Sequence, residues 1–354
     1  MSGVLSGKGY VGLANLGNTC FLNACIQSLN HTIEIAQLRP HYEPFIRPDR
    51  PDSVIIREYM ELREIMTQNN GVVSPDKFVH QVHTLARQKN RDLFTGWAQN
   101  DMPEFLLFMI DAMHNSISRG IPVHISGKSE HSVDELAMQC YGMLKSVYEK
   151  EYSEIMDLFY GIYVSEIKSK NGKIRHSLKP ESFFILDIPI APQKDPAKRI
   201  SLYDCFDVFT ATEYMHGENA WWNEKTGRKE DIQKRITFWN FPKVLVITLK
   251  RFTPDGLRKI EDWVDFPLEN LDLSAYVSGY SPSSYCYDLY SVCNHFGGVQ
   301  GGHYTAFVKR PDGDEWLHAN DTRIDRISRP SDEIITPHAY CLFYRKRPAS
   351  SEKK

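Results

Sequence analysis

One cysteine stands where its thiol could act as a nucleophile. Cys20 follows a turn rich in glycine and asparagine, Gly12-Leu-Ala-Asn-Leu-Gly-Asn-Thr, and opens a stretch with helical apolar periodicity. The free N–H groups and the dipole at a helix N-terminus stabilise a thiolate, the reactive form of cysteine. A cysteine in such a position is more often simply buried. Asn15 and Asn18 favour chemistry, because a side-chain amide just before the nucleophile can donate a hydrogen bond to the oxyanion of an acyl-transfer reaction.

A second glycine-rich segment offers the base that such a thiol needs. Four glycines lie between positions 297 and 302, directly before His303 and the predicted strand 304–308. Glycine lets the backbone adopt positive φ and lets another chain approach closely, so we expect His303 on a rigid element beside a groove. His295 ends the preceding predicted strand and is the alternative base, ranked well behind His303.

The imidazole also needs a partner for its second ring nitrogen. Asn320 and Asp321 follow on what reads as the adjacent strand, and either could supply it. An Asn-Asp pair at a strand end is most often only a turn, so this interpretation depends on the cysteine and histidine segments. Cys25 stands five positions after Cys20, about 140° away around a helix, so we assign its thiol to the core.

The elements that must hold these residues change type along the chain. Helical periodicity comes first, over 20–29, 57–66 and 101–114. Segments rich in β-branched and aromatic residues follow, at 183–190, 244–249, 287–293, 304–308 and 340–344. This order predicts an α+β fold with helices first and an antiparallel sheet after. The pattern weakens between about 190 and 243, and no linker is rich enough in Pro, Gly or Ser to separate two domains.

Composition narrows the class of protein. The 354 residues carry 42 Lys and Arg against 45 Asp and Glu, a net charge of -3 that argues against the basic surface of a nucleic-acid-binding protein. No apolar run approaches the ~20 residues of a membrane span, so we expect no membrane insertion. Seven cysteines, an odd number without a C-x-x-C pair, favour a reducing intracellular setting over a disulfide framework or a four-cysteine zinc site.

Together these segments resemble the ubiquitin-specific protease family of cysteine deubiquitinases. The likeness runs from about residue 12 to residue 345 and keeps the family's motifs in order. These are the Cys box 12–23, the second box Gln99-Asn-Asp-Met-Pro-Glu-Phe-Leu106, the strand 242–252, and the His box 301–307 with 316–322 and 340–345. Several matching segments in the right order are highly specific.

The resemblance implies a role for each candidate residue. Cys20 would be the nucleophile, His303 the general base, Asn320 the third member and Asn15 the oxyanion donor. Asp321 would be a supporting polar residue or a substitute third member. The implied reaction is hydrolysis, through an acyl-enzyme, of the isopeptide or peptide bond after the C-terminal glycine of ubiquitin. The implied partners are ubiquitin and ubiquitinated proteins.

The implied architecture is a papain-like cysteine peptidase fold arranged as thumb, palm and fingers. A single catalytic domain would cover 10–347, with a helical thumb at about 10–156, fingers and part of the palm at about 157–252, the palm with the His box at about 253–347, and a frayed tail at 348–354. The ubiquitin tail, which carries Arg and ends in Gly-Gly, would thread between thumb and palm. Asp101, Gly301 and Gly302 would line its path, although a helix cap and a tight hairpin explain them adequately.

The chain departs from the family pattern at two places. Many members hold the fingertips with two C-x-x-C zinc pairs, but the corresponding positions are Ser169, Gly172, Asn223 and Thr226. We therefore predict that the protein binds no metal and needs no cofactor. The second departure is Pro103 in the second box, a residue that suits the first turn of a helix.

Three other functions fit the sequence less well than deubiquitination. A catalytically silent ubiquitin-binding scaffold is disfavoured because nucleophile and base are both present. A protease for a ubiquitin-like modifier such as SUMO would keep the chemistry, and the altered fingers are the hint toward it. A papain-like peptidase acting on unfolded peptides is disfavoured because its local cysteine signature is absent. We place the protein in the cytoplasm, the nucleus or both. The sequence names no recruiting protein, and the stretch 41–90 is the candidate surface for one.

Overall fold

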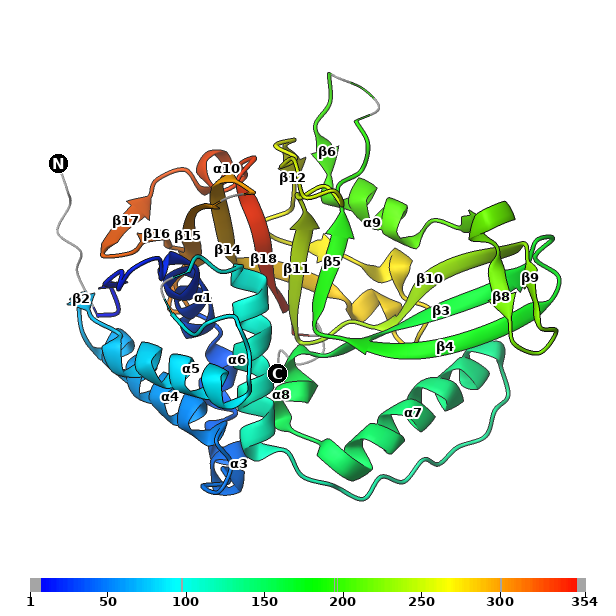
Figure 1. Ribbon diagram of the computed structural model, residues 1–354, viewed down its shortest axis with the longest axis horizontal. Helices are drawn as coiled ribbons and strands as arrows, with labels where there is room; N and C mark the ends of the chain where they lie inside the picture. The colour runs from blue at the N-terminus through cyan, green and yellow to red at the C-terminus, as the bar shows by residue number, and fades with distance from the viewer. Residues whose placement is uncertain (1–7, 97, 194, 196, 300, 349–354) are drawn as a thin grey trace.

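A computed structural model describes residues 8–348 of the chain, except residues 97, 194, 196 and 300. Helices gather at one end of the molecule, a long narrow sheet extends from the other, and a larger sheet lies between them (Figure 1). Helices precede most of the strands, so the predicted α+β class is confirmed. The predicted tail at 348–354 lies outside the described residues except for residue 348. No helix in the described part of the chain is long and apolar enough to cross a lipid bilayer.

The helices at this end come from the part of the chain predicted as the thumb. Its helices are α1 (Cys20–Asn30), α2 (Ile33–Gln37), α3 (Arg39–Tyr42), α4 (Ser53–Gln68), α5 (Asp76–Gln88) and α6 (Met102–Ile117). The three predicted helices are confirmed as α1, α4 and α6, and each is longer than its periodic stretch. α5 was not predicted, although its buried residues Phe78, Val82 and Leu85 have helical spacing. The short strands β1 (Val11–Leu13) and β2 (Gly71–Val73) pair in parallel beside these helices.

Two further helices lead out of the thumb. α8 (Glu154–Phe159) packs against α6, whereas α7 (Ser132–Glu151) lies under the long sheet (Figure 1). Cys140 of α7 is fully buried in a small cluster with Trp239 of that sheet. Thus α7, which lies before the predicted division near residue 156, packs against the long sheet.

The long sheet forms the fingers. Its strands are ordered β4-β3-β10-β7 and comprise β3 (Gly161–Ser169), β4 (Arg175–Phe183), β7 (Glu213–Met215) and β10 (Ile232–Asn240). A small hairpin, β8 (Trp221–Asn223) and β9 (Arg228–Glu230), lies at its far end. Near its base lie α9 (Leu202–Thr210) and the parallel pair β6 (Ile200–Ser201) and β12 (Val264–Asp265). The weakly patterned segment 190–243 is therefore largely this excursion.

The larger sheet forms the palm and carries the His box. Its strands are ordered β17-β16-β15-β14-β18-β11-β5, and β13 (Leu271–Asp272) also pairs with β14. Their bounds are β5 (Ile185–Pro189), β11 (Val244–Lys250), β14 (Cys286–Gly298), β15 (Gly301–Lys309), β16 (Trp316–Asn320), β17 (Arg323–Ile327) and β18 (Ala339–Lys346). The short helix α10 (Pro330–Glu333) lies between β17 and β18.

One pair of strands at the edge of the palm differs from the predicted antiparallel sheet. β5 pairs with β11 in parallel, with Ile185 opposite Val246, whereas the other strands of the palm pair antiparallel. Parallel pairing needs a long crossover, and the excursion through the fingers supplies it. The strand predicted at 183–190 is also two strands, because the chain passes from the fingers to the palm at Phe184.

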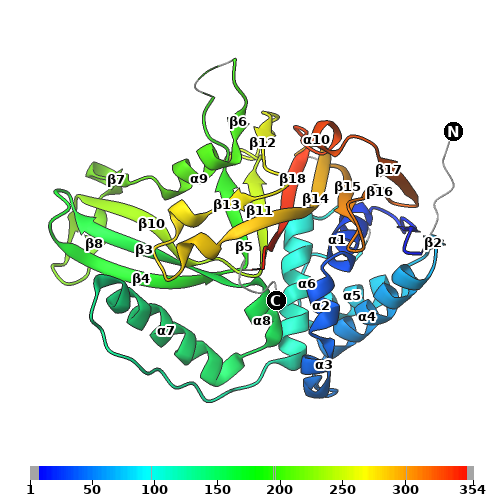
Figure 2. The ribbon, with the colours of Figure 1, turned by 180° about the vertical axis from the view of Figure 1, so that it is seen from behind.

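The helix that carries Cys20, α1, is buried between the other thumb helices and the palm. Every residue of α1 is buried, and the helix packs across β14 and β15. Figures 1 and 2, seen from opposite sides, both place α1 beside β15. Cys25 is 0% exposed, which confirms its assignment to the core. One apolar core therefore joins the element that carries Cys20 to the strand that carries His303.

Candidate active site

Cys20 opens α1, and its side chain faces the palm. The residue is 5% exposed and lines a cavity of about 190 Å³ together with Tyr304, the residue that follows His303. Burial raises the pKa of the Cys20 thiol, hydrogen bonds from the backbone of Tyr304 and Phe21 act against this rise, and the Asp321 carboxylate adds to it. Burial thus opposes the stabilisation of the thiolate that the helix terminus offers, and the thiol needs the base that the sequence predicts.

His303 and Asn320 are brought together by the register of the palm strands. Ala306 of β15 pairs with Ala319 of β16, so this register sets Asn320 diagonally across from His303 on the same face. The His303 Nε2 lies 2.7 Å from Asn320 Oδ1. An amide oxygen only accepts, so this contact assigns the ring proton to Nε2 and leaves Nδ1 able to take up another. The contact fits the predicted orienting role of Asn320.

Asp321 binds the segment that carries Cys20. Its carboxylate accepts hydrogen bonds from Asn15 Nδ2 at 2.9 Å and Asn23 Nδ2 at 2.8 Å, and its carbonyl accepts one from the Leu13 N–H at 2.8 Å. The residue adopts a positive φ of 48°, which turns the chain sharply after β16. Of its two suggested roles, the contacts favour support of the cysteine segment over replacement of Asn320.

Asn15 is held on two sides. Its Oδ1 accepts hydrogen bonds from the backbone N–H groups of Gly17 at 3.0 Å and Thr19 at 3.2 Å, while Nδ2 donates to Asp321. An amide nitrogen carries two protons, so one N–H remains for an oxyanion. The Asn15 side chain is thus oriented before any substrate arrives.

The three residues predicted to line the substrate tail lie in the wall of the same cavity. Asp101 caps α6 by accepting from the Glu104 N–H at 3.2 Å, and it accepts hydrogen bonds from the hydroxyls of Tyr340 at 2.9 Å and Tyr304 at 3.3 Å. Burial raises the pKa of the Asp101 carboxyl, against these hydrogen bonds. In the free protein Asp101 therefore serves as a helix cap, the alternative given for it above.

Gly301 and Gly302 lie where a side chain would block the hairpin. A Cβ on Gly302 would meet the Phe296 carbonyl oxygen at 2.0 Å and His295 Nε2 at 2.6 Å. The sequence did not predict a role for Gln99, the first residue of the second box, in holding this hairpin. Its side-chain amide accepts from the Gly302 N–H at 2.9 Å and donates to the Gly302 carbonyl at 3.2 Å.

The alternative base, His295, also lines the cavity but has a different environment. Its ring is 4% exposed and packs on Tyr304 at 4.7 Å between centroids. Burial lowers the pKa of His295 to about 4. Its Nδ1 has no hydrogen-bond partner within the described part of the chain, whereas His303 is held by Asn320. The geometry therefore favours His303 as the base.

The fingertip positions form hydrogen-bonded turns. Ser169 Oγ donates to Asn171 Oδ1 at 2.8 Å and accepts from the Ile174 N–H at 3.0 Å. Asn223 is 4% exposed, and its Oδ1 accepts from the Lys225 N–H at 3.0 Å. Over residues 8–348, apart from the four undescribed positions, no three His, Cys, Asp or Glu side chains are grouped to hold a metal ion.

Comparison with known proteins gives this geometry a family context. The sequence model described as ubiquitin carboxyl-terminal hydrolase matches residues 11–344. The chain is 35% identical over 351 residues to ubiquitin carboxyl-terminal hydrolase 2 of Homo sapiens, covering 96% of this chain and 55% of that protein. It is 33% identical to ubiquitin carboxyl-terminal hydrolase 21 of Mus musculus, and the match covers 97% of this chain and 62% of that protein. It is 32% identical to ubiquitin carboxyl-terminal hydrolase 2 of Gallus gallus, and the match covers 97% of this chain and 95% of that protein.

Solved structures show the same fold. A chain of the SAGA DUB module Ubp8/Sgf11/Sus1/Sgf73 bound to monoubiquitin matches with a TM-score of 0.70 and 24% identity, covering 99% of this chain and 72% of that one. The same module bound to ubiquitin aldehyde matches with a TM-score of 0.70 and 23% identity, and the same coverage. Fold and site together define a papain-like cysteine peptidase architecture of thumb, palm and fingers. The chain belongs to the ubiquitin carboxyl-terminal hydrolase family, and it spans little more than half the length of its human relative.

Proposed function

We propose that the protein is a thiol-dependent deubiquitinase that hydrolyses the isopeptide or peptide bond after the C-terminal glycine of ubiquitin. The observation that carries this proposal is the 2.7 Å contact of His303 Nε2 with Asn320 Oδ1, beside the cavity that holds the Cys20 thiol. Membership of the ubiquitin carboxyl-terminal hydrolase family supports the choice of substrate. Its partners are then ubiquitin and ubiquitinated proteins.

The reaction follows from the protonation states in the free protein. His303 Nδ1 takes the proton of the Cys20 thiol, whose pKa burial has raised, and the thiolate attacks the carbonyl carbon of the terminal glycine. The remaining N–H of Asn15 donates to the oxyanion that forms. The imidazolium returns its proton to the leaving amine, and a thioester remains on Cys20. Water, deprotonated by His303, attacks that thioester and releases the ubiquitin carboxylate and the thiol.

The cavity wall carries the residues that the family resemblance assigns to the substrate tail. Gly301 and Gly302 lie in this wall, with their side-chain positions already filled by Gln99 and Phe296, and the Asp101 carboxylate lies near enough to the cavity to meet a cationic side chain of the tail. The division into thumb, fingers, palm and tail remains part of this proposal. So does a reducing intracellular setting in the cytoplasm or nucleus, which the seven free thiols support.

A covalent probe tests the proposal and its main alternative together. Ubiquitin bearing a C-terminal electrophile is expected to form an adduct, and SUMO bearing the same electrophile is not. Cys20→Ala should form no adduct while still binding unmodified ubiquitin. Preferential reaction with the SUMO probe would replace ubiquitin by a ubiquitin-like modifier. Binding of ubiquitin by the wild-type protein without any adduct would identify a silent scaffold.

A further inference from the structure

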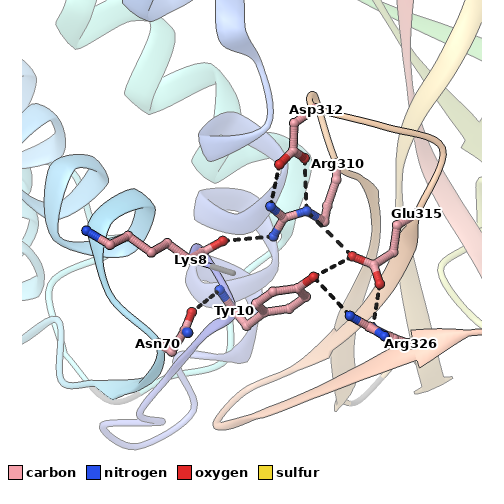
Figure 3. Close-up of polar contacts among 7 residues, drawn as sticks. All are labelled: Lys8, Tyr10, Asn70, Arg310, Asp312, Glu315 and Arg326. Atoms are coloured by element: carbon pink, nitrogen blue, oxygen red, sulfur yellow. Dashed lines mark hydrogen bonds and ion pairs between the residues drawn. The ribbon is translucent and has the colours of Figure 1, made fainter. Parts of the chain in front are cut away.

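Four polar side chains join the segment before β1 to the part of the palm formed by β15, β16 and β17 (Figure 3). Tyr10 is 5% exposed, and its hydroxyl donates a hydrogen bond to Glu315 Oε2 at 2.7 Å and accepts one from Arg326 at 3.3 Å. The Arg310 guanidinium lies over the Tyr10 ring at 4.5 Å, and Arg326 forms an ion pair with Glu315. This group of Tyr10, Arg310, Glu315 and Arg326 is named the Tyr10 clamp.

Further hydrogen bonds hold the backbone at Lys8 and at Tyr10 itself. Arg310 donates to the backbone carbonyl of Lys8 at 2.9 Å, and Asp312 fixes the same guanidinium through two contacts of 3.0 and 2.6 Å. The Tyr10 N–H donates to Asn70 Oδ1 at 3.1 Å, on the thumb side. The residue is therefore tied to the thumb by its backbone and to the palm by its side chain (Figure 3).

The strand β1 carries this anchoring toward the catalytic residues. At its far end the Leu13 N–H donates to the Asp321 carbonyl at 2.8 Å. Gly12 packs so closely on Thr322 that an added Cβ would lie 2.3 Å from the Thr322 carbonyl oxygen. Asp321 directly follows Asn320, the residue that holds the His303 ring.

Contacts at both ends of the β16–β17 hairpin therefore hold strand β1. Glu315 and Arg326 lie at the open end of the β16–β17 hairpin, where Trp316 pairs with Ile327, whereas Asp321 lies in its turn. A strand held at both ends of its neighbour cannot slide or tilt along it. At the open end, the Tyr10 hydroxyl supplies the contacts with Glu315 and Arg326.

The same strand is bound to the helix that carries the thiol. Gln27 of α1 donates through Nε2 to the Val11 carbonyl at 2.7 Å, and Asn23 of α1 donates to the Asp321 carboxylate at 2.8 Å. A displacement of β1 would therefore move α1 and Cys20 relative to the palm. Other polar contacts join the far end of α1 to the palm, where Ser28 Oγ lies 2.8 Å from Ser291 Oγ and Thr32 Oγ1 lies 2.7 Å from the Tyr290 hydroxyl. The contacts through β1 and Asp321 therefore act at the end of α1 that carries Cys20.

We propose that Tyr10 is a positioning residue, whose hydroxyl sets the placement of Cys20 against the His303–Asn320 pair by locking β1 onto the β16–β17 hairpin. Phenylalanine at this position keeps the ring and its contact with Arg310 but loses both hydroxyl contacts. The inference deepens the proposed deubiquitinase and rests on it for the choice of reaction. Small misplacements of reacting groups cost rate rather than affinity, because substrate contacts elsewhere are kept.

The test is Tyr10→Phe, compared with Tyr276→Phe. The control removes a bond of the same kind, which the Tyr276 hydroxyl donates to Asp207 at 2.9 Å, and neither residue lines the cavity. With a fluorogenic ubiquitin amide, kcat of Tyr10→Phe should fall about tenfold with KM within about twofold, since a misplacement of ~1 Å can cost 10²-fold. The control should keep the kcat of the wild type. Glu315→Gln, which leaves Tyr10 intact and keeps an oxygen acceptor for its hydroxyl, should keep most of the wild-type kcat.

Alkylation of Cys20 by iodoacetamide gives a second measurement that does not involve ubiquitin. The pH dependence of its rate reports the thiol–imidazole pair, so it should shift in Tyr10→Phe and stay unchanged in Tyr276→Phe. A lower melting temperature with unchanged kcat and unchanged alkylation would overturn the proposal, and so would a rise in KM alone. If the wild-type protein does not act on ubiquitin at all, the proposed function fails, and the alkylation profile still decides the role of Tyr10.

Discussion

Replacing Asn320 tests how much of catalysis depends on the orientation of the imidazole. Asn320→Ala removes the acceptor that lies 2.7 Å from His303 Nε2, and this bond becomes charge-assisted once the ring takes the proton of Cys20. A hydrogen bond to a charged group contributes about 1.5–3 kcal/mol, and each 1.36 kcal/mol changes a rate about tenfold. We therefore expect kcat to fall roughly 10- to 150-fold. KM should stay within about twofold, because Asn320 is not among the described residues of the cavity wall.

Initial rates on a fluorogenic ubiquitin amide measure both constants, and Asp321 supplies the comparison. Asp321→Ala removes the acceptor of the Asn15 and Asn23 amides, so it should lower stability and reduce kcat less than Asn320→Ala does. Asp321→Asn keeps one acceptor oxygen and should fall between Asp321→Ala and the wild type. If Asp321→Ala lowers kcat more than Asn320→Ala, the assignment of the orienting role to Asn320 is wrong.

Two further predictions concern stability and metal content. Burial lowers the pKa of both His31 and His295 to about 4 from 6.5, so the unfolded chain binds protons first as the pH falls. The free energy of unfolding should therefore decrease between pH 6.5 and 4, by up to about 3 kcal/mol per histidine. In urea titrations His31→Gln should show a weaker pH dependence of this free energy. The same pH dependence in His31→Gln as in the wild type would contradict the prediction. Because Ser169 and Asn223 occupy hydrogen-bonded turns, the purified protein should contain no stoichiometric zinc, and a chelator should leave the melting temperature unchanged. Zinc at one equivalent, lost together with stability, would overturn that prediction.

The parts of the site that the sequence predicts are those set by local rules. A turn rich in glycine and asparagine followed by apolar periodicity is sufficient to place Cys20 at a helix start. The pairing of His303 with Asn320 follows from two adjacent antiparallel strands, in which side chains alternate between faces. The helices α1, α4 and α6 were predictable for the same reason, since each carries a dense apolar stripe.

The remaining features depend on contacts between distant parts of the chain. Asp321 binds Asn15 across 306 positions, and Tyr10 reaches Glu315 across 305, so neither contact leaves a trace in the local pattern. The raised pKa of Cys20 arises from burial, which only the packed thumb and palm create. The parallel pairing of β5 with β11 likewise depends on the path through the fingers, which the weak pattern between 190 and 243 did not reveal.

The central claim is that the Cys20 thiol attacks the carbonyl of the terminal glycine of ubiquitin. Its most direct test is to react the protein with ubiquitin bearing a C-terminal electrophile and to identify the modified residue by peptide mass spectrometry. The account predicts an adduct on Cys20 alone, formed equally fast in Cys25→Ala, because the Cys25 thiol is 0% exposed and burial raises its pKa well above the ordinary value. An adduct on Cys25 or another thiol, or turnover that survives Cys20→Ala, would contradict it.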